Sequence, residues 1–179
     1  MYYNKRTLIL TAVLTILLGS AQHFFYDWFP NLFTAFLSPV NESLWEHSKL
    51  VFIPYLLGAL FLNRDRPGGL RPWILTLPLL IAWMLILGWL YNVVLSGEWD
   101  WVNILIYLLI MLLGFWLPTR FLHPIPNSLW YPVLAGVVLL GMALVVFTFY
   151  PPNQILFWDL SIARAWFSSP CRYFDNLLQ

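Results

Sequence analysis

Five long apolar segments dominate the sequence, and they restrict its fold more than any other feature. Residues 72–95 and residues 129–149 contain no charged residue at all. A hydrocarbon core about 30 Å thick is crossed by about 20 helical residues. Lipid offers no hydrogen bonds to an open backbone, so such segments cross it as helices. The sequence therefore predicts an all-α integral membrane protein.

The predicted fold has about five transmembrane helices and two short interfacial or re-entrant helices on the outer side. We expect the spans at about residues 7–25, 40–62, 72–95, 101–119 and 129–149. Residues 26–37 and 153–167 are aromatic but interrupted by charged residues, which favours helices that lie in the interface. Only 9% of the residues are charged, against about 25% in soluble domains. The length suits a single membrane domain, residues 1–179.

Basic residues gather on one side of the predicted membrane. Six of the nine lysines and arginines precede the first span or lie in two loops of that side: Lys5, Arg6, Arg64, Arg66, Arg71 and Arg120. The positive-inside rule makes this side cytoplasmic. We expect a multi-pass protein of the plasma (inner) membrane, with its N-terminus in the cytoplasm and its C-terminus outside. Residues 5–21 also resemble a cleavable signal peptide; we favour a retained first span.

Acidic residues gather on the opposite, outer side, which holds seven of the eight. Because acids contribute little to orientation, this distribution indicates either a site or a solvated rim. Tryptophans near both predicted interfaces form an aromatic belt. The net charge of +1 provides no basic field for nucleic acid, so membrane lipids are the expected partners.

The most polar string, residues 41–49, lies at the outer start of the second span. Ser38-Pro39 suits a helix start, which predicts a helix over residues 39–62. On such a helix Glu42, Glu46 and Lys49 share one face, with Trp45 beside them and His47 directed elsewhere. Ionisable groups at membrane depth usually mark function, although an ion network that fixes helix packing is an open alternative.

The outer residues also suggest metal ligation or acid–base chemistry. The candidates for these roles are His23, Asp27, Glu42, Glu46, His47 and Asp159. Histidine with carboxylates suits zinc, which is one option for an otherwise unknown cofactor. No strict metal spacing such as HExxH occurs, and the ammonium of Lys49 weakens the metal hypothesis because it can neutralise a carboxylate.

Further residues are candidates for ligand binding around the same patch. They are Tyr26, Asp27, Trp28, Asn41, Trp45, Lys49, Asn92, Asn103 and Trp158. The two asparagines near the outer ends of the third and fourth spans can bond across helices or line a cavity. Pro151-Pro152 ends the last span, so that the following segment can cover the patch or anchor in the interface.

Three strings carry a resemblance to a known family. They are residues 23–31 (HFFYDWFPN), residues 38–49 (SPVNESLWEHSK) and residues 149–152 (FYPP) with Phe157 and Asp159. Together they resemble a family of small prokaryotic membrane proteins, a domain of unknown function. The resemblance implies a multi-pass fold with an outward patch built from these strings, and it implies no activity.

Three functions remain open at this point. The first is a membrane-embedded enzyme, such as a metal-assisted hydrolase of a lipid or lipid-linked substrate, with catalytic residues among His23, Glu42, Glu46, His47 and Asp159. The second is a binding or transport component whose aromatic-lined outer cavity holds a small amphipathic or cationic ligand. The third is a structural accessory subunit whose polar cluster only locks helices together.

Overall fold

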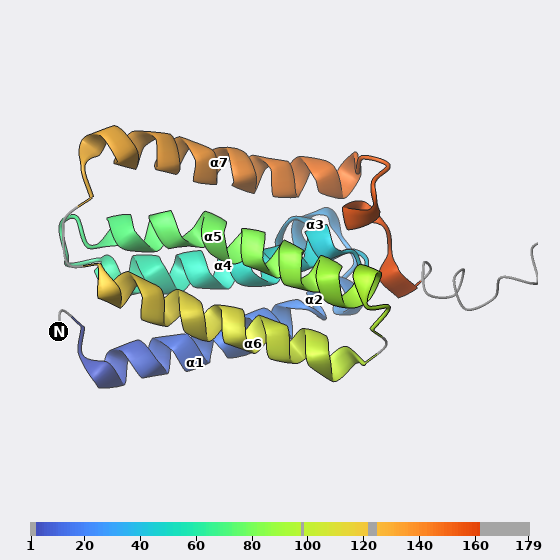
Figure 1. The fold of residues 1–179 in the computed structure, drawn as a ribbon, viewed down its shortest axis with the longest axis horizontal. Helices are drawn as coiled ribbons and strands as arrows, with labels where there is room; N and C mark the ends of the chain where they lie inside the picture. Colours follow the sequence, from blue (N-terminus) through green and yellow to red (C-terminus); the bar gives the residue numbers. More distant parts are fainter. Residues whose placement is uncertain (1–2, 98, 122–124, 162–179) are drawn as a thin grey trace, which may run out of the picture.

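A computed structural model describes residues 3–97, 99–121 and 125–161 and consists of helices and their connections (Figure 1). Long helices run side by side along one axis, and short helices gather at one end. The described residues contain no strand, so the predicted all-helical class is confirmed.

Five long helices form the bundle within the described residues. They are α1 (Lys5–Gln22), α4 (Leu44–Asn63), α5 (Leu70–Trp89), α6 (Asp100–Trp116) and α7 (Asn127–Phe149). A π-helical turn, η1 (Leu90–Val94), extends α5, and a 3₁₀ turn, η2 (Leu117–Arg120), extends α6. The short elements α2 (Phe25–Trp28), α3 (Leu32–Leu37) and η3 (Ile155–Phe157) lie together at the end that we call the site end.

Three helices of the described chain are long and apolar enough to cross a membrane. They cover residues 70–94, 100–120 and 127–149 and coincide with the third, fourth and fifth predicted spans. The other two predicted spans are occupied by α1 and α4, whose first turns carry Lys5-Arg6 and the polar residues 45–49. The structure thus supports a membrane protein, and the count of five spans stays a prediction.

Of the two predicted interfacial segments, only the first lies entirely within the described residues. Residues 26–37 contain two helices, α2 and α3, separated at Pro30. Asn31 begins α3 with a capping box, because its side chain accepts from the backbone N–H of Thr34 (3.0 Å) while the Thr34 hydroxyl accepts from Asn31 N–H (3.2 Å). Residues 153–161 contain η3, and the remainder of the segment predicted to reach residue 167 lies outside the described residues.

Helix α4 lies at the centre of the bundle and packs against α1, α5, α6 and α7. Its residues Val51, Tyr55 and Ala59 are completely buried. The Tyr55 ring packs against Trp73 and Phe115, with ring centroids 5.8 Å apart in both pairs. Because neighbouring helices pack around the first turns of α4, the polar side chains of Glu46 and Lys49 are buried within the protein.

In contrast to the central helix α4, helix α7 forms one side of the bundle (Figure 1). Only 11% of its most apolar stretch is buried, and large side chains such as Leu139 and Met142 are exposed. An apolar surface of this extent suits acyl chains rather than water. The outward surface of α7 therefore agrees with a helix that faces lipid.

Close approach at Gly114 ties α6 to the core. A Cβ atom at this position would lie 2.6 Å from Leu80 Cδ1 and 2.9 Å from Tyr55 Cε2. The Tyr55 hydroxyl donates to the Gly114 carbonyl oxygen at 3.1 Å. Small residues allow membrane helices to approach in this way, which is a main source of their packing energy.

We predict that Gly114→Leu destabilises the bundle by about 1–3 kcal/mol because it overpacks the core. The matched control is Gly136→Leu on α7, where an added Cβ meets no atom within 4 Å. Thermal unfolding of both variants in detergent measures the difference. Equal melting temperatures for the two variants would contradict the helix packing described here.

Candidate metal centre

The connection from α3 to α4 places the polar string differently from the sequence prediction. Helix α4 begins at Leu44, and the side chain of Ser43 caps it by accepting from the backbone N–H of Glu46 at 3.2 Å. The predicted helix start at Pro39 is therefore wrong. Asn41 explains the difference, because its Oδ1 accepts from the backbone N–H of Ser43 (3.0 Å) and so favours a turn over a helix.

The later helix start separates the two glutamates. Glu42 lies in the loop before α4, so it does not share a helix face with Glu46 and Lys49 as predicted. Its carboxylate turns instead toward His47, with Oε2 3.3 Å from the imidazole Nε2. The single predicted stripe is thus replaced by two clusters, one around His47 and one around Lys49.

The first cluster, which we call the triad, joins His23, Glu42 and His47. His23 follows the last residue of α1, and its Nε2 lies 3.2 Å from His47 Nε2 and 3.8 Å from Glu42 Oε1. One potential ligand atom from each residue lies within 4.8 Å of the other two. Residues 24 positions apart in the chain are thus brought to one point.

The spacing of these atoms fits a divalent metal such as zinc. Zinc binds imidazole nitrogen at about 2.0–2.1 Å in a tetrahedral arrangement, which puts ligand atoms about 3.3 Å apart. The distance of 3.2 Å between the two Nε2 atoms and that of 3.3 Å from His47 Nε2 to Glu42 Oε2 match this value, and the distance from His23 Nε2 to Glu42 Oε1 is longer, 3.8 Å. Two histidines and one glutamate are also a ligand set of catalytic zinc sites, where the fourth position holds water or substrate.

The hydrogen bonding of His47 prepares it as a ligand. Its Nδ1 lies 2.8 Å from the carbonyl oxygen of Ser43, which requires a hydrogen on Nδ1. The other nitrogen, Nε2, faces His23 and Glu42 and donates to the Glu42 carboxylate at 3.3 Å, so a metal would take the place of the proton on Nε2. Such a carbonyl behind a histidine is the usual means of orienting a metal ligand. The residue that caps α4 therefore also sets the direction of the imidazole.

The protonation states of the two other members suit the same role. Burial, assisted by the neighbouring His47, lowers the pKa of His23 and favours the neutral imidazole. The hydrogen bond from His47 lowers the pKa of Glu42 and keeps its carboxylate ionised. The Glu42 side chain is 51% exposed, against 19% for His47, so the triad opens to the surroundings on the glutamate side.

The second cluster is a buried ion pair between Lys49 and Glu46. The ammonium Nζ lies 2.7 Å from Glu46 Oε2, and the side chains are only 1% and 3% exposed. The ammonium also donates to the carbonyl oxygens of Ala35 (2.8 Å) and Ser38 (3.2 Å). Lys49 therefore joins α4 to the end of α3 and to the loop that follows it.

Glu46 extends this network in two further directions. Its Oε2 accepts from the backbone N–H of Val40 at 3.0 Å, and its Oε1 accepts from the hydroxyl of Thr148 on α7 at 2.9 Å. Both carboxylate oxygens are thus used within the protein. Lys49 neutralises Glu46 and not Glu42, so the ammonium does not compete with a metal in the triad.

Asp159 is the predicted catalytic residue that lies beside the triad without belonging to it. The backbone N–H of Leu160 donates to the carbonyl oxygen of Glu42 at 3.4 Å, which holds the end of the chain segment after η3 against the loop. The negative charge of Asp159 acts on Glu42, where it opposes the lowering of the pKa. Its Oδ1 accepts from the backbone N–H of Ser161 at 2.9 Å.

The other predicted binding residues are dispersed. Trp45 faces the rings of Phe147 and Phe157, with centroids 5.5 and 5.1 Å away, rather than the triad. Asn92 and Asn103 bond to each other across helices at 2.8 and 3.1 Å. The backbone N–H of Tyr26 donates to the hydroxyl of Ser38, and the Trp28 ring stacks on Phe24. The indole N–H of Trp158 donates to Asn153, and the charge of Asp27 acts on His23.

The sequence contains a signal that would have placed Glu42 outside the helix. Ser43 followed three residues later by Glu46 has the spacing of a capping box, which indicates a helix start at Leu44. That start would have released Glu42 from the face of Glu46. The proximity of His23 carries no such local signal, since it depends on how α1 packs beside α4.

A comparison with known families tests the predicted membership in a family of unknown function. The sequence model of a family of unknown function, DUF6512, matches residues 1–165. The chain belongs to DUF6512. The predicted membership in a family without assigned function is thereby confirmed, and all three members of the triad lie within the part that DUF6512 covers. Neither a curated protein nor a solved structure matches the chain.

We predict that Lys49→Met or Glu46→Gln destabilises the protein by about 3–5 kcal/mol, because each leaves an uncompensated buried partner. The double variant Glu46→Leu/Lys49→Met should lose less than the sum of the single losses. The exposed pair of Arg64 and Asp65 offers a control, and Asp65→Asn should cost at most about 1 kcal/mol.

Unfolding in detergent mixtures of increasing denaturing strength measures these differences in free energy. If Lys49→Met unfolds no more easily than Asp65→Asn, the ion pair does not hold the site end together.

Proposed function

We propose that this protein is a membrane-embedded, metal-dependent hydrolase that acts on an ester of a lipid or lipid-linked substrate at the outer leaflet. The observation that carries the proposal is the convergence of His23, Glu42 and His47, whose ligand atoms have the spacing of a zinc site. Three protein ligands leave one position for water, which distinguishes a catalytic from a structural zinc site.

The proposed orientation places the site end outside the cell. Arg64, Arg66, Arg71 and Arg120 lie at or near the helix ends opposite the site end, and the positive-inside rule makes that end cytoplasmic. In this arrangement α1 and α4 complete five spans in the plasma membrane. The N-terminus is then cytoplasmic, and the triad lies at the level of the outer headgroups.

A lipid substrate is favoured by the surface next to the triad. Trp28, Phe29, Leu32 and Phe33 of the α2–α3 region are each between 59% and 69% exposed. Four large exposed apolar side chains on two short helices and their connection are typical of a segment that dips into the interface. The triad would then lie at the boundary between lipid and water, where an ester carbonyl of a lipid is found.

The proposed chemistry is hydrolysis by a metal-activated water. His23, Glu42 and His47 would hold the metal, which would supply a Lewis acid and a more acidic water. Asp159 would accept a proton from this water as the water oxygen bonds to the ester carbonyl carbon. It would return the proton to the alcohol oxygen as the bond between that oxygen and the carbonyl carbon breaks, so that a carboxylic acid and an alcohol are the products.

The other two functions explain less of the site. A structural accessory role accounts for the Lys49–Glu46 ion pair but gives no reason for two histidines and a glutamate to converge beside it. A binding component with an aromatic cavity is less favoured, because the Trp45 ring is packed between Phe147 and Phe157 and does not face the triad.

We predict that the purified protein binds one zinc ion per chain and that His47→Ala or Glu42→Gln weakens binding at least tenfold, since even the loss of an outer-shell partner costs about 10–100-fold. His123→Ala, which removes the third histidine of the chain, should leave binding unchanged. Metal analysis together with zinc titration measures both values. Triad variants that retain zinc with the affinity of the native protein would refute the metal centre.

We predict that a fluorogenic lipid ester is hydrolysed by the zinc-loaded protein in mixed micelles and that a chelator abolishes this activity. Asp159→Asn should lower the rate by about 10²–10⁴-fold while zinc content is retained, because a general base is lost but the ligands remain. An Asp159→Asn variant with the native rate would exclude Asp159 as the base.

A further inference from the structure

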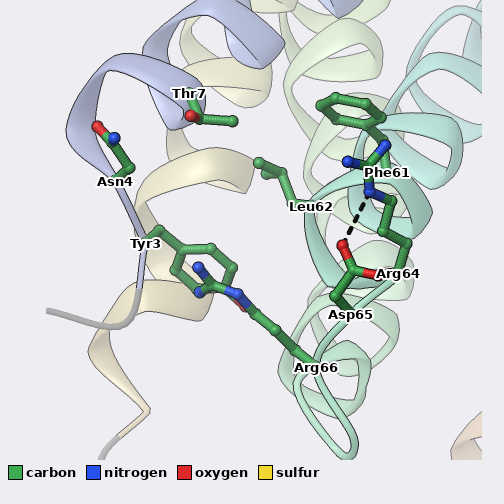
Figure 2. Close-up of a pocket in the computed structure, with 8 residues that line it drawn as sticks. All are labelled: Tyr3, Asn4, Thr7, Phe61, Leu62, Arg64, Asp65 and Arg66. Atoms are coloured by element: carbon green, nitrogen blue, oxygen red, sulfur yellow. Dashed lines mark hydrogen bonds and ion pairs between the residues drawn. The ribbon is translucent and has the colours of Figure 1, made fainter.

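A cavity at the opposite end of the bundle is separate from the triad. It has a volume of about 160 Å³ and lies between the first turn of α1 and the end of α4 (Figure 2). Its lining consists of Tyr3, Asn4, Thr7, Phe61, Leu62, Arg64, Asp65 and Arg66. A water molecule takes up about 30 Å³, so the cavity has room for a tetrahedral oxyanion.

Arg66 is held over the cavity on a fixed aromatic platform. Its guanidinium carbon lies 4.3 Å from the centroid of the Tyr3 ring, and Figure 2 shows the two groups stacked. The Tyr3 hydroxyl donates to Asn63 Oδ1 at 2.6 Å and accepts from the indole N–H of Trp73 at 2.8 Å. Trp73 is completely buried, so the platform is anchored in the core.

Arg64 provides a second guanidinium, whose carbon lies over the Phe61 ring, 5.2 Å from the ring centroid. It donates through Nε to Asp65 Oδ2 at 3.0 Å, and both side chains are largely exposed, 68% and 82%. Exposed pairs of this kind are weak, so a phosphate can compete with the Asp65 carboxylate for this guanidinium. The guanidinium fork matches a phosphate in geometry as well as in charge.

The surroundings of the cavity favour a phosphate that carries acyl chains. Phe61 in the lining and Leu57 one turn before it on α4 are both 51% exposed. On α1 the lining residue Thr7 is followed along the same face by Leu10 and Leu14, which are 61% and 65% exposed. Apolar side chains therefore continue from the cavity along both helices, where acyl chains would lie.

We infer that this cavity binds a phosphate group, and specifically the headgroup of an anionic phospholipid at the inner surface of the membrane. Two arginines, one preset on Tyr3 and one released from a weak ion pair, hold the phosphate, and the exposed faces of α1 and α4 hold the chains. This site shares no residue with the triad, so its test does not depend on the proposed hydrolase.

The experiment compares three probes on the full chain in detergent: a short-chain phosphatidylglycerol, a phosphatidylcholine of the same chain length, and inorganic phosphate. Native mass spectrometry and calorimetric titration give the affinities. The native protein should prefer phosphatidylglycerol. Arg64→Gln/Arg66→Gln should weaken its binding about 25-fold, since each arginine near a lipid phosphate contributes about fivefold.

Two further variants distinguish a built site from a diffuse positive surface. Thr7→Trp fills the cavity without changing any charge and should also weaken phosphatidylglycerol binding. Arg120→Gln removes a cation that stacks on Trp116 (4.7 Å) outside the cavity and should have no effect. All variants are first checked for native thermal unfolding, and Arg66→Gln alone replaces the double variant if the latter is unstable.

Each outcome is decisive. Preference for phosphatidylglycerol that is lost in the arginine and Thr7 variants supports the lipid headgroup. Variant-sensitive binding of inorganic phosphate without any lipid preference retains the phosphate site but overturns the lipid as its source. Binding of all three probes that is equal in the native, Arg64→Gln/Arg66→Gln and Thr7→Trp proteins overturns the proposal.

Discussion

The ion pair between Lys49 and Glu46 is the interaction on which the site end depends. An ammonium and a carboxylate buried within a bundle are costly unless every donor and acceptor is used. Here Lys49 reaches the carbonyl oxygens of Ala35 and Ser38, while Glu46 accepts from Val40 and, on α7, from Thr148. These bonds fix the loop of residues 38–43 from both sides, and this loop presents Glu42 to the two histidines.

The first turns of α4 therefore divide between two tasks. Glu46 and Lys49 point into the bundle and hold it together, whereas His47, between them in the sequence, points to His23 and Glu42. Ser43 serves both tasks, because its side chain caps the helix and its carbonyl oxygen orients His47. One short string thus contributes both to a buried, fully bonded network and to the partly exposed triad.

The sequence predicted the helical class well, because apolar length is a local property. The third, fourth and fifth predicted spans coincide with membrane-compatible helices. The predicted start of α4 was wrong, because Ser38-Pro39 and Ser43 with Glu46 are both reasonable helix starts. The turn at Asn41 favours the later start locally, and the bonds from Lys49 to Ala35 and from Thr148 to Glu46, which hold this arrangement, join different elements. The approach of His23 to His47 was not predicted either, because it depends on the packing of α1 beside α4, which neither local sequence determines.

X-ray absorption spectroscopy of the zinc-loaded protein tests the central claim, the metal centre, most directly. The triad predicts a low coordination number, two imidazole ligands with their characteristic outer-shell scattering, and zinc–nitrogen distances of about 2.0 Å. His23→Ala should remove one imidazole from the spectrum. A six-coordinate shell of oxygens without imidazole scattering, or a spectrum unchanged by His23→Ala, would contradict the metal centre proposed here.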